Sequence, residues 1–386
     1  MNARWHIVTP ERPPDCGGVG DYTAQVAEAL AETGDDVSVY SPPAGRPWTA
    51  PAGIEAVILQ DRFGRGSVRE LAARLDRDPS SRLLVEYVPS VFGRRGTNVP
   101  FCRWLRSRRN TGGDVRVMFH EPYLYLRWRP DHIVTAFTQR AMAAILLDAA
   151  THVYLSTDTW RRYLARFRAD AVRRAVTLPI PSAIPCVKAA EEVEAARGAM
   201  TGNATHLVGH FGSYGDHVAP LLRRALNDLL LSDAHAAALC AGSGSESFVE
   251  RMVAERPALR GRLFATGRVS ARDISLHLQA CDLLLQPYPD GVTTRRTSVM
   301  AGLANGRAVV TVDGALTEDI WRATGAVALV PASDAAALVR TARDLLADTP
   351  ARASLAARAL ATYESRFALR HTIDALRGEG TQRSSA

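Results

Sequence analysis

The segment TLPIPSAIPC, residues 177–186, contains Pro179, Pro181 and Pro185 and interrupts an otherwise regular sequence pattern. Proline fixes φ and removes a backbone N–H donor, so we expect a stiff, extended connector rather than a helix. Short apolar runs recur on both sides of this connector. The sequence therefore predicts two similar parts joined by a proline-rich segment.

Each part alternates short apolar runs with stretches of helical periodicity. The runs lie at 5–9, 36–40, 56–59, 83–88, 115–120 and 151–155, and then at 207–211, 236–241, 263–266, 282–287, 308–312 and 327–330. They are nearly continuous in apolar residues, which is typical of strands covered on both faces. Tyr22, Val26 and Leu30 recur at helical spacing between the first two runs, and Gly34 follows as a stop. This alternation predicts an α/β fold with a doubly wound parallel sheet in each part.

The chain length of 386 residues fits two domains better than a single core. We predict an N-terminal Rossmann-like lobe over 1–178, a proline-rich hinge over 179–187 and a C-terminal lobe over 188–365. A last helix is expected over 351–376, so that 366–386 holds its end and a disordered polar tail. Ligands of such sheets bind beyond the carboxyl ends of the strands, which predicts a site in a cleft between the lobes.

Composition restricts the partners. The chain has 47 basic and 40 acidic residues, and Lys188 is its single lysine, so site cations must be arginines or Lys188 itself. This charge favours an anionic partner, but no basic strip interleaved with aromatic residues argues for nucleic acid. The basic stretch FCRWLRSRR, residues 101–109, leaves open a peripheral contact with an anionic membrane.

Five scattered cysteines without a CxxC pair predict reduced thiols. The N-terminal stretch MNARWHIVTPERPP lacks a long apolar run, so we do not expect it to be a signal peptide, and no apolar run reaches membrane-spanning length. We therefore expect a cytoplasmic protein. His120 and His132 are too far apart in sequence for metal-ligand spacing, and Asp76 and Asp78 lie in an arginine-rich segment. We expect neither a metal nor a bound cofactor.

Three stretches can carry chemistry. CGGVGDYT, residues 16–23, opens the first helix with glycines whose N–H groups suit an anion, although a plain tight turn explains them equally well. VMFHEPY, residues 117–123, places His120 and Glu121 at a strand end, where a histidine is either a proton acceptor or structural. In the third, Asp290-Gly291 precedes Arg295 and Arg296 at a helix start, an arrangement that suits a diphosphate unless the arginines are merely solvated.

The order GGVGDYTAQVAEAL, FHEP and PYPDG…MAGLANGRAVVT resembles the GT-B glycosyltransferases of family GT4 over most of the chain. The resemblance implies two Rossmann-like lobes that transfer a sugar from a nucleotide-diphosphate sugar, with retention and without a metal. The implied acceptor is a small molecule, a glycan or a lipid-linked sugar. A catalytically degenerate partner or scaffold protein, and another sugar-nucleotide enzyme such as an epimerase or hydrolase, stay open as alternatives.

The resemblance also assigns roles to individual residues. His120 would lie beside the transferred sugar as a catalytic residue. The other assignments are Gly17 and Gly18 at the donor diphosphate, Asp21, Tyr22 and Glu121 on the acceptor side, and Gly267, Arg268 and Val269 at the nucleotide.

Two family features are missing. The stretch GHFGSYGDHVAP, residues 209–220, lacks the usual Arg/Lys pair, and Ala301 stands where the second of two paired glutamates is expected. We therefore predict that Arg295, Arg296 and Ser298 bind the diphosphate and that Asp290 replaces the first glutamate at the sugar hydroxyls. Glu318 is expected to orient this side of the site.

Overall fold

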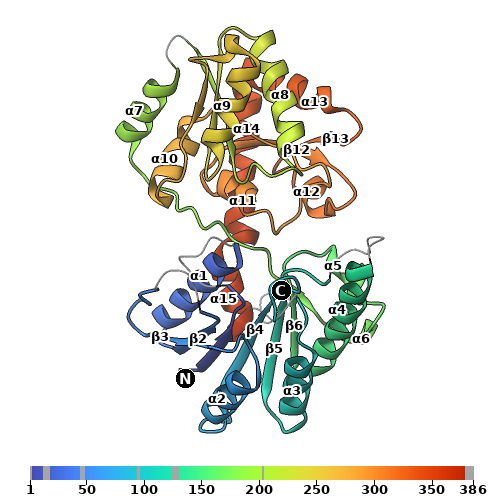
Figure 1. Cartoon of the computed structure of the whole chain (residues 1–386). Coiled ribbons are helices and arrows are strands. Elements are labelled where there is room, and N and C mark those ends of the chain that lie inside the picture. Colours follow the sequence, from blue (N-terminus) through green and yellow to red (C-terminus); the bar gives the residue numbers. More distant parts are fainter. Residues whose placement is uncertain are drawn as a thin grey trace. The chain divides into compact units, whose positions relative to one another are not determined.

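The computed structural model describes residues 2–11, 18–43, 48–93, 96–123, 130–201 and 204–378, with side chains of 130–132 left out (Figure 1). The chain forms two compact units. The first unit is Met1–Pro179 together with Leu369–Ala386, and the second unit is Ile180–Ala368. Each unit is built on one parallel sheet.

The sheet of the first unit has the strand order β3-β2-β1-β4-β5-β6-β7, and all its neighbouring strands are parallel. Its strands are β1 (Arg4–Val8), β2 (Asp36–Ser41), β3 (Ile54–Ile58), β4 (Arg82–Tyr87), β5 (Asp114–Phe119), β6 (His152–Leu155) and β7 (Val176–Thr177). Its helices are α1 (Gly18–Glu32), α2 (Arg65–Leu75), α3 (Val99–Asn110), α4 (Pro130–Ala149), α5 (Trp160–Leu164), α6 (Ala169–Arg173) and α15 (Leu369–Arg377). The strand order reverses between β1 and β4, and ligands of open α/β sheets bind beside such a point.

Alternation along β4 and β5 decides which side chains reach which layer. Leu83, Val85 and Tyr87 of β4 join the core that includes side chains of α2, α3 and α4. Glu86 and Arg116 therefore point to the opposite face. There the guanidinium of Arg116 donates a hydrogen bond to the Leu376 carbonyl of α15, and α15 packs against α1 (Figure 1).

The sheet of the second unit has the order β10-β9-β8-β11-β12-β13 and is also parallel throughout. Its strands are β8 (His206–Phe211), β9 (Ala236–Ala241), β10 (Leu263–Ala265), β11 (Leu283–Gln286), β12 (Ala308–Asp313) and β13 (Ala328–Pro331). The helices are α7 (Ala190–Thr201), α8 (Ala219–Ser232), α9 (Ser245–Glu255), η1 (Pro257–Leu259), α10 (Ala271–Ala280), α11 (Thr297–Ala304), α12 (Asp319–Thr324), α13 (Ala335–Ala347), α14 (Thr349–Thr362) and the π-helical turn η2 (Tyr363–Phe367). The predicted pair of doubly wound parallel sheets is confirmed, with switch points at β1/β4 and β8/β11.

The proline-rich connector is held by the second unit. The N–H groups of Ile180, Ser182 and Val187 donate to the Thr294 carbonyl, the Tyr363 hydroxyl and the Ser275 hydroxyl, at 3.0, 3.2 and 3.0 Å. Prolines cannot supply such donors, so the residues between them make these bonds.

The C-terminal segment differs from the single helix expected over 351–376. The backbone of Ala368 is extended, with φ −61° and ψ 145°, and it separates η2 in the second unit from α15 in the first. A periodic pattern does not show such a break because the apolar spacing continues through it. The predicted polar tail lies outside the described residues from 379 onward. None of the described helices is both long and apolar enough to cross a membrane.

Candidate functional site

His120 follows β5 directly and is fixed by its backbone and its ring. Its N–H donates to the Tyr87 carbonyl at 3.1 Å, and its carbonyl accepts from Ser156 Oγ and Trp160 Nε1 at 3.0 and 2.9 Å. The ring of Tyr22 from α1 meets the imidazole edge-on, with 5.1 Å between centroids. Burial raises the pKa of Tyr22 well above its ordinary value, so its hydroxyl stays protonated.

Glu86 is the partner of the His120 ring. Its Oε2 lies 2.7 Å from His120 Nε2, and its side chain is fully buried in β4. Because a carboxylate only accepts, Nε2–H is the donor, and in the neutral ring Nδ1 is the nitrogen without a proton. We did not predict Glu86 from the sequence. A signal was present, since it is the one acidic residue in the strand RLLVEY.

The N-terminus of α1 receives a carboxylate from its own chain. Burial raises the pKa of Glu11, while hydrogen bonds from the Gly20 and Val19 backbone and the nearby His120 oppose the shift. Gly18 is the first residue of α1 and has open space where a Cβ would lie, and Asp21 is exposed in the first turn. Gly17 lies outside the described residues. The diphosphate role of these glycines stays a prediction, as does the acceptor-side role of half-buried Glu121.

In the second unit, Asp290 and Arg296 form an ion pair. Arg296 Nη2 lies 2.8 Å from both Asp290 oxygens, and His217 Nε2 lies 3.0 Å from Asp290 Oδ1. The Arg296 guanidinium stacks over Tyr288 at 4.2 Å from the ring centroid, and the Tyr288 hydroxyl is hydrogen-bonded to Ser298 Oγ. The structure thus brings together Asp290, Arg296 and Ser298 as predicted members of one site. It also shows that Asp290 already offsets part of the arginine charge.

Two loops hold Asp290 in place. Leu316 N–H donates to the Asp290 carbonyl at 2.8 Å, and Gly291 has φ +102° and no room for a Cβ against Thr317 and Gly314. Glu318 accepts hydrogen bonds from the backbone and hydroxyl of Thr294, just before half-buried Arg295. The carboxylate of Glu318 therefore orients the loop that carries the two arginines.

Among the described residues, the buried polar atoms without a hydrogen-bond partner include His210 Nε2 and Gln286 Oε1 on the adjacent strands β8 and β11. They also include Thr293 Oγ1 and Arg296 Nε in the segment after β11. A Cβ on Gly212, which follows β8, would lie 3.8 Å from His210 Nε2 and 3.7 Å from Ser298 Oγ, so His210 and Ser298 lie beside the same stretch of backbone. Unpaired buried polar atoms are rare in proteins and are commonly satisfied by a ligand or water. The sequence did not single out His210 or Gln286, because each looks like an ordinary strand residue.

The turn predicted to meet the nucleotide follows β10. Gly267 has φ +61°, and its N–H donates to Ser245 Oγ at 2.9 Å. A Cβ there would lie 2.8 Å from the Glu246 carboxylate, so this turn packs closely on the start of α9. Arg268 is exposed and Val269 is half-buried. The adjoining stretch Gly242–Ser245, which repeats the pattern of a glycine-rich turn before a helix, was missed.

Comparison with solved structures decides the architecture. The whole chain aligns with WaaG, described as a glycosyltransferase involved in lipopolysaccharide biosynthesis, with a TM-score of 0.68, 16% identity and coverage of 97% of this chain and 100% of that one. This chain has the GT-B fold. Sucrose-phosphate synthase from Thermosynechococcus elongatus aligns with a TM-score of 0.72, 16% identity and 99% coverage of both chains. Anabaena HepE, in complex with UDP and glucose, aligns with a TM-score of 0.69 and 14% identity, over 98% of this chain and 99% of the HepE chain.

Sequence comparison adds a family match in one part of this GT-B chain. Residues 205–348 match the family described as "Glycosyl transferases group 1", a segment that runs from β8 through α13. Curated proteins give no significant match to the chain. The predicted GT-B architecture is confirmed, and the family match falls on the unit that holds Asp290, Arg296 and the unpaired polar atoms.

Proposed function

We propose that this protein is a glycosyltransferase that moves a sugar from a nucleoside-diphosphate sugar to an acceptor hydroxyl. The observation that carries the proposal is the group of buried, unpaired polar atoms at the β8/β11 switch point. These atoms lie in the segment that matches group 1 glycosyl transferases. Hydroxyl-rich and phosphate-rich ligands supply the donors and acceptors that such atoms lack.

In this proposal the second unit binds the donor. Arg295, Arg296 and Ser298 at the start of α11 hold the diphosphate, since guanidinium groups pair well with phosphate oxygens. Asp290 accepts a sugar hydroxyl, because a carboxylate has more acceptor sites than the two side chains Arg296 and His217 occupy. The turn of Gly267, Arg268 and Val269 contacts the nucleotide base. The structure of HepE, which has the same fold, holds UDP and glucose, and this supports a nucleoside-diphosphate sugar as the donor in our proposal.

The first unit binds the acceptor, with Asp21, Tyr22 and Glu121 on that side and His120 beside the transferred sugar. We propose transfer with retention on the front face of the sugar. The acceptor oxygen bonds to the anomeric carbon, the bond from that carbon to the diphosphate breaks, and the acceptor proton passes to the leaving phosphate. Arginines and backbone N–H groups stabilise the departing charge without a metal. We place the reaction in the cytoplasm, and the free Cys102, Cys186, Cys240 and Cys281 support this location.

The first experiment is a thermal-shift screen against UDP-, GDP- and dTDP-glucose, because a ligand that binds the native state raises its apparent stability. Donor affinity is then measured by calorimetry for Arg296→Ala. We expect roughly a tenfold or greater loss, in keeping with about 1.5–3 kcal/mol for a charged hydrogen bond. The matched control is Arg272→Ala, which removes an exposed ion pair to Glu192 in the same unit.

Unchanged donor affinity in Arg296→Ala would contradict the assignment of this arginine. Donor binding without turnover on small-molecule, glycan and lipid-linked acceptors would instead favour a catalytically inactive partner protein. Donor hydrolysis or epimerisation without transfer would favour another sugar-nucleotide enzyme.

A further inference from the structure

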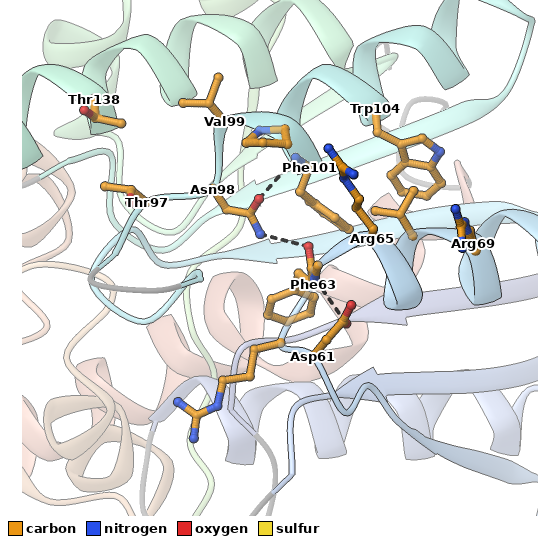
Figure 2. Close-up of a pocket in the computed structure, with 14 residues that line it drawn as sticks. Asp61, Phe63, Arg65, Arg69, Thr97, Asn98, Val99, Phe101, Trp104 and Thr138 are labelled. Atoms are coloured by element: carbon orange, nitrogen blue, oxygen red, sulfur yellow. Dashed lines mark hydrogen bonds between the residues drawn. The ribbon is translucent and has the colours of Figure 1, made fainter.

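A pocket of about 710 Å³ lies in the first unit between the N-terminal turns of α2 and α3 (Figure 2). Its apolar wall is formed by Phe63, Val68, Val99, Phe101 and Trp104. A cavity of this size accommodates a drug-sized molecule, and its aromatic lining suits an apolar body. Neither the family match nor the site residues described above include this pocket.

The loop that shapes the pocket is held rigidly. Arg62 and Phe63, with φ of 50° and 66°, are the described non-glycine residues in the left-handed region. Phe63 is almost fully buried, stacks on Phe92 at 4.9 Å, and its carbonyl accepts from Asn98 Nδ2 at 3.0 Å. A strained loop fixed by packing and hydrogen bonds gives a preformed cavity, and binding then needs little reorganisation.

The charge around the pocket is positive. Arg65 and Arg69 lie one turn apart on α2 on either side of Val68, and both are exposed. Within the described chain neither guanidinium forms an ion pair or a hydrogen bond. Figure 2 shows both on the same side of the pocket as Trp104. Arg62, in the loop before α2, is a third exposed arginine of the lining. The pocket therefore combines an apolar wall with uncompensated cations, of which Arg65 and Arg69 lie together on α2.

The carboxylate and the amide of the pocket are already engaged. The Asp61 carboxylate accepts from the backbone N–H groups of Gly66 and Ser67, at 2.7 and 3.1 Å, and so caps α2. Asn98 Oδ1 caps α3 by accepting from Phe101 N–H at 3.2 Å. Since both helix ends are capped, the two arginines supply the attraction for an anion.

We infer that this pocket binds an amphipathic anion, with its apolar body against Phe63, Phe101 and Trp104 and its acidic group at Arg65 and Arg69. The acid is a carboxylate, sulfonate or phosphate, carried by a soluble molecule or by a lipid. The inference rests on the pocket and not on sugar transfer, and its test requires no donor.

The test is displacement of 8-anilinonaphthalene-1-sulfonate, followed by fluorescence, with octanoate and 1-octanol as matched competitors. We expect octanoate to compete at a concentration at least tenfold lower than octanol, because the two differ only in the charged group. Arg65→Gln/Arg69→Gln should abolish this preference. The matched control is Arg103→Gln/Arg106→Gln, which removes the same charge from exposed positions on α3 outside the pocket.

Equal competition by octanoate and octanol, or an unchanged preference in Arg65→Gln/Arg69→Gln, would overturn the inference. Thermal unfolding of each variant shows that it is folded. Trp104→Ala should weaken the binding of both octanoate and 1-octanol. Undiminished binding of the two competitors by that variant would count against the pocket. Co-sedimentation with phosphatidylglycerol vesicles but not phosphatidylcholine vesicles, lost in the double variant, indicates a lipid source; octanoate binding without co-sedimentation indicates a soluble one.

Discussion

At the scale of single residues, the Glu86–His120 pair shows how one buried carboxylate orients an imidazole. The carboxylate fixes which ring nitrogen carries the proton, and the carbonyl contacts from Ser156 and Trp160 fix the ring's position. A buried carboxylate is costly unless it is hydrogen-bonded. The presence of Glu86 in a core strand is therefore better explained by its hydrogen bond to His120 than by a gain in stability.

Glu86→Gln tests this coupling while preserving shape. The amide can donate as well as accept, so it no longer fixes the tautomer of the imidazole beside the transferred sugar. We expect kcat to fall by roughly 10²-fold through lost positioning, as His120→Ala should also do. The readout is the pH profile of kcat for wild type and both variants. Full activity in His120→Ala would return this histidine to a structural role, and an unaltered profile in Glu86→Gln would remove the proposed coupling.

The buried His210 should make the stability of the protein depend on pH. Burial lowers its pKa from 6.5 to about 4, so between these values the unfolded chain binds a proton that the native state does not. The free energy of unfolding should therefore decrease as the pH falls through this window, by roughly 2–3 kcal/mol near pH 4.5.

His210→Gln removes this titration and keeps a donor for the Leu285 carbonyl. Urea unfolding near pH 7 and near pH 4.5 should show a smaller loss of stability in this variant than in wild type. Exposed His235→Gln is the control and should behave as wild type. Equal losses in wild type and His210→Gln would show that His210 does not titrate in this window.

At the scale of elements, the loops after β11 and β12 interlock. The backbone of Asp290 and Gly291 meets Gly314 and Thr317 so closely that neither loop can move without the other. From the sequence we predicted Asp290, Arg295 and Arg296 in the first loop and Glu318 at the end of the second. The contact between Leu316 and Asp290 was not predicted, because it joins residues more than twenty positions apart in the chain.

Gly291→Ala tests whether this close contact costs more than placing alanine at a positive φ does by itself. A Cβ would lie 2.4 Å from Thr317 Oγ1 and 2.9 Å from Gly314 N, so we expect a loss of stability of at least about 2 kcal/mol and weaker donor binding. Gly112→Ala has a similar backbone, with φ +92° and nothing within 4 Å of a Cβ, and should cost only about 1 kcal/mol. Chemical denaturation compares the stability of the two variants, and calorimetry compares their donor affinity. An equal loss of stability in both variants would rule out the clash at Gly291.

At the scale of the whole molecule, the last helix belongs to the unit formed by the beginning of the chain. Thr372, Ile373 and Leu376 of α15 are buried, Arg116 donates to the Leu376 carbonyl, and Arg377 lies 3.6 Å from Asp35. The first unit is therefore not complete until the entire second unit has been synthesised. This explains why a linear division at the proline-rich connector describes the units only in part.

Truncation after Ala368 should destabilise the first unit selectively. Loss of two buried aliphatic side chains and of the carbonyl that accepts from Arg116 should cost about 5–9 kcal/mol. Hydrogen exchange should accelerate in β1, β4 and β5 and stay unchanged in β8–β12. Truncation after Gly378 is the control and should leave both units protected, whereas equal acceleration in both units would show that α15 stabilises the entire molecule.

The sequence by itself determined the layered architecture, since continuous apolar runs, helical periodicity and a cluster of prolines are local signals. It also selected His120, Asp290 and Arg296 as candidate site residues, because each follows a predicted strand or opens a predicted helix. Only the tertiary structure decided that Glu86 holds His120, that Asp290 pairs with Arg296, and that α15 returns to the first unit. Those facts depend on contacts between distant parts of the chain, and no local pattern records which distant side chain a residue will meet.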